Sequence, residues 1–290
     1  MTMDWYLFAF SSAIFTALAV IIEKKSLLKQ HSIEYSSVLS IFMFILSLIF
    51  VRLVNFNLDL RVWILIALES LFFGLSTFFT AKAIRHMEVS SVSSLMVFLP
   101  AFVLFFGIII LGETINNLQL LGILFLILGI YILEIRKGGL LKPFTQIFKY
   151  QYINYVFLSL TLTALSLILA RYLLSTGLVD VYTLTFISYM FFMVYMVILI
   201  FVLHDGIHGI IRGFKMSGVL IFFAATFTLV AKLLQNQAIL IQNVTLVETI
   251  RRTYVIIVIL LGGELFHEKN LTKKIIATLV MLLGAYLIIA

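Results

Sequence analysis

The segment Asn243-Val-Thr-Leu-Val-Glu248-Thr-Ile-Arg251-Arg252-Thr-Tyr254 opens an apolar run that continues as Val-Ile-Ile-Val-Ile-Leu-Leu-Gly-Gly to Gly263. Three formal charges therefore lie within a stretch that otherwise resembles a membrane-spanning helix. An ionisable side chain at this depth costs roughly 2.5–3.5 kcal/mol on insertion scales, and such groups usually face a cavity or a charged partner. The fold must therefore supply a cavity, or partners, for these side chains.

The composition is that of an integral membrane protein. Of the 290 residues, 63% are hydrophobic and only 11% are charged, whereas an ordinary soluble domain has about 25% charged residues. The absence of cysteine excludes disulfides and thiolate metal sites. We interpret the net charge of +7 as Lys and Arg in short loops that set the topology, and we expect no nucleic-acid partner.

Apolar runs of spanning length recur along the whole chain. A spanning helix needs about 20 mostly apolar residues, and short polar segments separate the runs. No alternating pattern of the kind found in membrane β-barrels occurs, so helices are expected to satisfy the backbone within the membrane. The sequence predicts an all-α integral membrane protein with ten transmembrane helices, at 4–23, 34–54, 61–84, 90–112, 117–135, 151–171, 180–203, 215–239, 243–264 and 271–290.

The two halves of the chain resemble each other. Thr16-Ala-Leu18 matches Thr163-Ala-Leu165, and Tyr35 matches Tyr182, in both cases 147 residues later. Further along, five matches share an offset of 155 residues, so eight residues are added in the second half, around 204–212. These later matches pair Ala83-Ile84 with Ala238-Ile239, Gly107 with Gly262, Glu113 with Glu268, Gly129 with Gly284 and Tyr131 with Tyr286.

An odd number of helices in each half has a topological consequence. If five helices follow five others through the bilayer, the second set is inverted relative to the first. Inverted repeats are typical of secondary transporters, whose substrate site lies near the midplane between the repeats. We therefore predict a first five-helix repeat at 1–135, a linker at 136–149 and a second repeat at 150–290.

The order of motifs resembles the EamA-type group of the drug/metabolite transporter superfamily. This resemblance covers nearly the whole chain and implies ten helices, an inverted repeat, a central cavity and alternating access. Known members move amino acids, amines, sugar phosphates, nucleotide sugars and drugs, so the family does not fix the cargo. The chain departs from the common pattern at Arg251-Arg252. The resemblance rests on Ala83-Ile-Arg-His-Met-Glu-Val-Ser-Ser-Val-Ser-Ser-Leu95, Pro100, Leu111-Gly-Glu113, Leu121-Gly-Ile-Leu-Phe-Leu-Ile-Leu-Gly-Ile-Tyr131, Phe266-His-Glu268-Lys and Leu283-Gly-Ala-Tyr286.

Glu248, Arg251 and Arg252 are the first candidates for a substrate site. Residues three and four apart are neighbours on a helix, so Glu248 can reach both arginines. One interpretation is an internally neutralised group at a helix interface. The other is that at least one guanidinium faces the cavity and binds a carboxylate or phosphate through its planar fork. Sugar-phosphate translocators of the superfamily carry a Lys-Arg pair on the corresponding helix, which is a similarity of position only.

Other polar side chains at membrane depth complete the candidate set. Lys232 and Asn236 share a face of the eighth helix, which either lines the substrate path or holds helices together through its amides. Glu69 is either a partner for a cavity lysine or a proton-coupling group. Glu113 and Glu268 are interpreted as helix-end caps. Lys82, and the pairs Lys24 with Arg171 and Tyr35 with Tyr182, are candidates for the cavity or its mouths, although snorkelling and interfacial anchoring explain them equally.

The sequence contains no signature of an enzyme. It has no P-loop and no grouping of a nucleophile with a base, and we interpret His204 and His208 as solvated loop residues rather than metal ligands. No cofactor or metal is expected. The orientation of the chain in the membrane stays open. The odd loops hold thirteen Lys and Arg and the even loops three, which places the termini outside by the positive-inside rule. The family resemblance implies that the termini are inside.

The function expected from these features is secondary transport, by alternating access, of a small polar, anionic or zwitterionic metabolite across the cell membrane. A proton or counter-substrate is a possible coupled species, and a monomer or homodimer the expected assembly. Two alternatives stay open. One is a proton-coupled exporter of lipophilic cations that relies on Glu69, Glu23 or Glu248. The other is a non-transporting, lipid-handling membrane subunit.

Overall fold

The computed structural model describes residues 5–111, 117–134 and 151–289, and every regular element within them is helical. Seven helical segments of this part of the chain are long and apolar enough to cross a membrane. The prediction of an all-helical membrane protein is therefore confirmed, while ten spans in two inverted repeats stay a prediction. The predicted linker 136–149 and Glu113 lie outside the described residues.

The first half comprises α1 (Trp5–Leu27), α2 (Ser32–Ser47), η1 (Leu48–Leu53), α3 (Leu60–His86), α4 (Val89–Met96), α5 (Leu99–Leu111) and α6 (Asn117–Glu134). The second half comprises α8 (Gln151–Ser175), α9 (Val181–Leu203), α10 (Ile207–Ile241), α11 (Val244–Arg251), α12 (Tyr254–Ile257), the π-helical turn η2 (Val258–Gly262), α13 (Gly263–Leu265) and α14 (Leu271–Ile289).

Two helices that were expected to be continuous are interrupted. The predicted span 90–112 breaks at residues 97–98, and the predicted span 243–264 breaks at 252–253, which are corresponding positions at the 155 offset. Pro100 explains the first break, because it has no N–H to donate to the carbonyl of Met96 one turn earlier. Val255 stands at the equivalent place in the second half, where i+3 hydrogen bonds such as Val255 N to Arg252 O tighten the turn.

The eight additional residues of the second half form helix rather than loop. The predicted helix 215–239 begins instead at Ile207, and non-helical backbone angles at Ser217 mark a kink within α10. This extension contributes to a charged cluster at one end of the molecule. Arg212 Nε lies 2.8 Å from Glu34 Oε1, and His204 Nε2 lies 3.1 Å from the same oxygen. The extra residues thus tie the α9–α10 connection to the start of α2.

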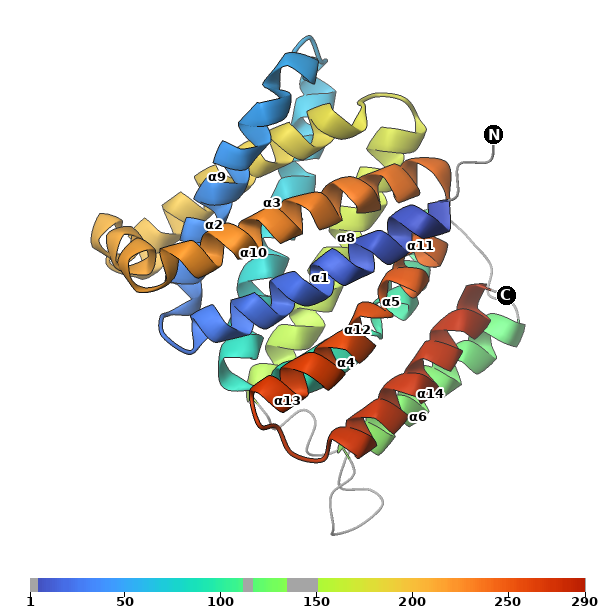
Figure 1. The fold of residues 1–290 in the computed structure, drawn as a ribbon. Helices are drawn as coiled ribbons and strands as arrows, with labels where there is room; N and C mark the ends of the chain where they lie inside the picture. The colour runs from blue at the N-terminus through green and yellow to red at the C-terminus, as the bar shows by residue number, and fades with distance from the viewer. Residues whose placement is uncertain (1–4, 112–116, 135–150, 290) are drawn as a thin grey trace.

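Helices of one half pack mainly against helices of the other. In Figure 1, α1 lies along α10, and α3 lies along α8, while α6 and α14 form a separate pair at the side of the bundle. Because α1 corresponds to α8 and α3 to α10 at the offsets found in the sequence, the two main contacts are equivalent to each other. The bundle is therefore built from reciprocal contacts between its halves.

Hydrogen bonds repeat this reciprocity at the level of single residues. Ser12 Oγ on α1 donates to the carbonyl of Ala231 on α10 at 2.7 Å. The corresponding Ser159 Oγ on α8 donates to the carbonyl of Ser76 on α3 at 3.1 Å. The two donor serines are 147 residues apart and the two acceptor residues are 155 apart, which are the offsets of the sequence matches.

The α6–α14 pair depends on a close approach of two backbones. A Cβ built on Gly284 would lie 2.6 Å from the carbonyl oxygen of Gly122 and 2.8 Å from the backbone N of Leu126. Main-chain atoms cannot move aside as the end of a flexible side chain can. Small residues commonly permit such contact between membrane helices, so glycine at position 284 is a packing requirement.

We therefore expect Gly284→Leu to lower the melting temperature of the purified protein, because overpacking of this kind costs about 1–3 kcal/mol. Gly218→Ala is the matched control, since the nearest atom to its new Cβ lies at 3.8 Å and alanine favours helix. Equal melting temperatures for Gly284→Leu and the wild type would contradict the close contact.

Candidate functional site

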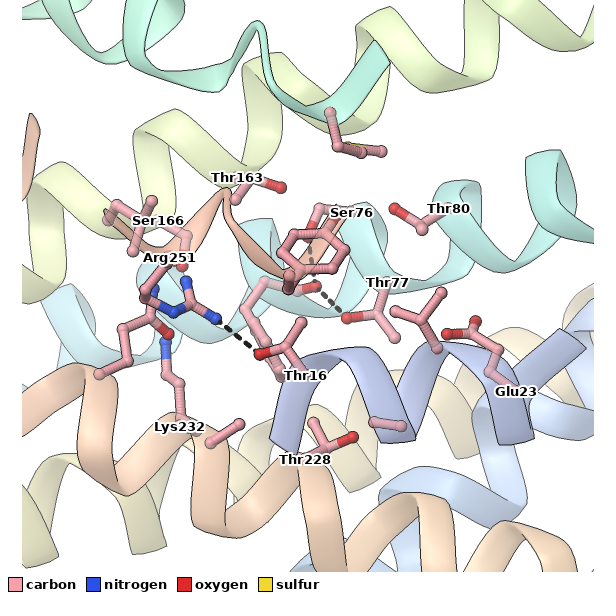
Figure 2. Close-up of a pocket in the computed structure, with 18 of the residues that line it drawn as sticks. Thr16, Glu23, Ser76, Thr77, Thr80, Thr163, Ser166, Thr228, Lys232 and Arg251 are labelled. Atoms are coloured by element: carbon pink, nitrogen blue, oxygen red, sulfur yellow. Dashed lines mark hydrogen bonds between the residues drawn. The ribbon is translucent and has the colours of Figure 1, made fainter. Parts of the chain in front are cut away.

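A cavity of about 210 Å³ lies between the halves of the bundle. Residues of α1, α2, α3, α4, α8, α10, α11 and α12 line it, and much of the lining carries hydroxyl groups (Figure 2). These hydroxyls are polar groups within a mostly apolar wall, and their oxygens can accept hydrogen bonds from a ligand or from water. They belong to Thr16, Ser76, Thr77, Thr80, Thr163, Ser166 and Thr228.

The lining is symmetric in position and asymmetric in charge. Thr16 of α1 corresponds to Thr163 of α8, and both line the cavity. At other corresponding positions the two halves differ: at the offset of 155 residues, Thr77 corresponds to Lys232 and Met96 corresponds to Arg251. All three cavity-lining cations, Lys232, Arg251 and Arg252, come from the second half. The basic groups of the lining thus all belong to one half of the duplicated frame.

Glu248 is the centre of the polar group on α11. Its carboxylate is fully buried and receives Arg251 Nη1 on Oε1 at 2.7 Å and Arg252 Nη2 on Oε2. Gln235 Nε2 of α10 also donates to Oε1, at 2.6 Å. One carboxylate is therefore shared by two guanidinium groups, which leaves one formal positive charge on the cluster. Glu248 therefore contacts both arginines, as its spacing along the helix predicted.

Arg251 is held by α1 as well as by Glu248. Its Nε donates to Ser12 Oγ at 2.9 Å and its Nη2 to Thr16 Oγ1 at 3.2 Å. Ser12 in turn donates to Ala231 O, so α1, α10 and α11 meet at this side chain. Because Arg251 lines the cavity, these contacts orient a guanidinium at its wall.

Arg252 joins the two helix breaks. Its Nη1 donates to the carbonyl of Met96 at 3.2 Å, the carbonyl that Pro100 leaves without a backbone donor. Its guanidinium lies 5.5 Å from the ring centre of Tyr254. Its Nε is buried and has no acceptor among the described residues. Arg252 therefore has one structural role across the breaks and one unsatisfied donor.

Lys232 forms the third cationic group of the cavity wall. Its Nζ lies 3.5 Å from Glu69 Oε1 and 4.9 Å from the ring centre of Phe73. Glu69 is also hydrogen-bonded by Ser166 at 2.9 Å and by Ser188 at 2.6 Å. The serines satisfy Glu69, and the long Lys232–Glu69 distance exceeds the 2.7–2.9 Å usual for such ion pairs. The ammonium group is thus the more loosely held partner.

The remaining predicted site residues are dispersed. Tyr35 is buried and lines the cavity. Asn236 is buried, and its Nδ2 donates to Thr185 Oγ1 of α9 at 3.1 Å. Lys82 Nζ lies 4.4 Å from the ring centre of Tyr155. Neither Asn236 nor Lys82 is among the residues that line the cavity.

Tyr182 and Lys24 also lie away from the cavity lining. Tyr182 is 38% exposed and packs its ring near Phe50. Lys24 Nζ donates to the carbonyl of Ile84 at 2.6 Å and to that of Met87, at the end of α3. The corresponding Arg171 donates to Ile239 O at the end of α10. This pair closes the ends of corresponding helices.

Glu268 caps a helix, as predicted. Its Oε1 accepts the backbone N–H of Val89 at 2.7 Å, at the start of α4, and Ser90 Oγ donates to its Oε2. Lys274 Nζ lies 3.1 Å from Glu268 and 2.5 Å from Glu88. Burial tends to raise the pKa of Glu88, but the hydrogen bond and charge of Lys274 outweigh it and hold that pKa below its usual value.

Several functional candidates were missing from the predicted set. Ser12 and Gln235 hold the charged cluster, while Thr16 and Thr77 line the cavity. Glu23, which the sequence suggested only for a cation exporter, lines it as well. The recurrence of Thr16 as Thr163 was the available signal, since a hydroxyl repeated on both first helices marks a shared surface. Single threonines in apolar helices are otherwise common, so Thr77 gave no signal of its own.

Comparison with known proteins agrees with the helical membrane architecture. Residues 3–135 match the model of the EamA-like transporter family. Among solved structures 28 chains match; one, titled "Crystal structure of protein", aligns with a TM-score of 0.58 and 11% identity over 98% of this chain and 96% of the other. At that identity the similarity concerns the fold alone. A comparison with curated proteins found no match.

The family match indicates the class of protein. Residues 3–135 match the EamA-like transporter family, which is part of the drug/metabolite transporter superfamily, and this match confirms the resemblance seen in that part of the sequence. It suggests a membrane transporter of the drug/metabolite type, a class whose members are generally not enzymes.

Glu248→Gln is expected to destabilise the protein by about 3–5 kcal/mol, because it leaves two buried guanidinium groups without their counter-ion. The measurement is the midpoint of thermal or chemical unfolding in detergent. The control is Glu264→Gln, because Glu264 is exposed near the end of the same span and forms no ion pair among the described residues. A Glu248→Gln midpoint equal to that of the control would contradict the shared ion pair.

Proposed function

We propose that this protein is a secondary carrier that moves a small polar, anionic or zwitterionic metabolite across the cell membrane by alternating access. The observation that carries the proposal is that two guanidinium groups, those of Arg251 and Arg252, line the cavity and share a single carboxylate, that of Glu248. An acidic group of the cargo can act as the second counter-ion.

The charge of the cluster supports the same conclusion. Glu248 neutralises one of two guanidinium groups, so one positive charge is left at the cavity wall, with the loosely held Lys232 nearby (Figure 2). Arginine presents parallel N–H donors that match a carboxylate or phosphate. We assign Arg251, Arg252 and Lys232 to binding of the anionic group, with Glu248 and Glu69 as their internal partners.

The reciprocal packing of the two halves supports the transport mechanism. Contacts of α1 with α10 and of α3 with α8 are equivalent under the sequence offsets, and the two helix breaks are equivalent as well. Carriers built from inverted repeats bind substrate near discontinuous helices at the repeat interface. The family match ends at residue 135, the proposed end of the first repeat, and we place the second repeat at 150–290.

The size and lining of the cavity favour this function over the alternatives. Its volume of about 210 Å³ is below the roughly 300–1,000 Å³ of pockets that hold drug-sized ligands, which weighs against lipophilic drugs as the cargo. The basic side chains and hydroxyls in its wall weigh against a bundle that serves only helix assembly. A small metabolite satisfies both observations.

Arg251→Gln is expected to lower uptake into proteoliposomes at least tenfold, the loss that corresponds to about 1.4 kcal/mol of binding. The substrate for the assay is selected beforehand by ligand-induced stabilisation of the wild type in a panel of carboxylates, phosphates and zwitterions. Arg61→Gln, at an exposed position of α3, is the control. Undiminished uptake by both Arg251→Gln and Arg252→Gln would rule out the anion-binding role.

A further inference from the structure

Glu23 is distinguished from the other charged residues of the cavity wall by its lack of a partner. Arg251 and Arg252 share Glu248, and Lys232 pairs with Glu69. Glu23 lines the same cavity, yet no hydrogen bond or ion pair joins its carboxylate to any side chain in the described part of the chain. Its neighbour Lys24 is directed to the carbonyls at the end of α3.

An unpaired carboxylate at membrane depth is costly and is retained only where it contacts water or a ligand. Glu23 is half-buried, and its atoms are absent from the buried unsatisfied groups, so the carboxylate is accessible from the cavity. At the corresponding position of the second half stands Ala170. The charge is therefore not part of the duplicated frame.

Glu23 lies at the opposite side of the cavity from Arg251 and Lys232. Figure 2 places Arg251 and Lys232 on one side and Glu23 on the other, with Thr16, Thr77 and other hydroxyls between them. The cavity thus has basic groups at one side and a carboxyl group without an internal partner at the other.

The surroundings of Glu23 suit a cationic ligand group. Tyr35 also lines the cavity and adds an aromatic ring to its wall. Aromatic ring faces attract cations, and a carboxyl group offers an ammonium group a partner of opposite charge. An anionic ligand group at this side would find no such partner in Glu23.

We propose that Glu23 forms a second, cation-binding subsite of the cavity, and that the cargo is a small zwitterion whose ammonium group lies at Glu23 while its acidic group lies at Arg251. This inference rests on the proposed transport function and narrows its substrate class. Anions without an ammonium group then bind more weakly, because they form no ion pair with Glu23. Because Glu23 and Arg251 lie at opposite sides of the cavity, an extended zwitterion with its charges at the two ends fits better than a compact one.

The test compares ligands that differ only in the ammonium group. The probes are β-alanine, γ-aminobutyrate and 5-aminopentanoate, each with its matched carboxylate, propionate, butyrate or pentanoate. Dissociation constants are measured on the purified full chain. For the wild type, at least one zwitterion is expected to bind about tenfold more tightly than its carboxylate, the effect of one partly desolvated charge pair.

The decisive variant is Glu23→Gln, which breaks no internal ion pair and should fold as the wild type does. It is expected to bring the zwitterion-to-carboxylate ratio close to one without weakening the carboxylate. Arg251→Gln is expected to weaken both ligands, and Asp59→Asn, at an exposed position, to change neither.

The other outcomes separate the two proposals. The Glu23 subsite would be overturned if the zwitterion-to-carboxylate affinity ratio were unchanged in Glu23→Gln. It would also be overturned if carboxylates bound but no zwitterion did. Both results would leave the proposed anion carrier intact. If neither class of probe binds the wild type while phosphates do, the subsite is again overturned. If no member of any class binds, the proposed function itself is overturned.

Discussion

The carboxylate of Glu248 lies between two guanidinium groups at a depth where each isolated charge would cost several kcal/mol. This interaction makes it possible for an apolar helix to carry Arg251 and Arg252 into the middle of the bundle. It also fixes their roles. Ser12 and Thr16 orient Arg251 toward α1, whereas Arg252 reaches the Met96 carbonyl that Pro100 leaves free. The local break of one helix is thereby stabilised by a charge on the other.

Around this group the molecule separates its architecture from its chemistry. Architecture follows the duplication: Ser12 and Ser159 make equivalent hydrogen bonds, and Lys24 and Arg171 close equivalent helix ends. Chemistry does not follow it, because the charges of the cavity wall have no charged counterparts at the matching positions. A symmetric frame can exchange between two equivalent conformations. An asymmetric lining can still bind one kind of cargo.

Helix content and the Glu248 contacts followed from the sequence, because spacing along a helix decides which side chains are neighbours. Pro100 was visible too, but its effect on the helix was not predicted, since membrane helices often tolerate proline. The cavity lining was harder. Lys82 and Tyr182 carry suitable groups, but they are directed to Tyr155 and Phe50, and only the rotation of each helix within the bundle decides this. Thr77 became recognisable as a wall residue only once α3 was placed.

The most direct test of a substrate cavity between the halves is the accessibility of a single introduced cysteine, since the chain has none of its own. Thr77→Cys lies in the cavity wall, and Phe105→Cys lies on the exposed apolar surface of α5. The structure predicts that a charged methanethiosulfonate reagent modifies Thr77→Cys, that bound cargo slows this reaction, and that Phe105→Cys stays unmodified within the bilayer. Equal resistance of both cysteines to the reagent would contradict the account.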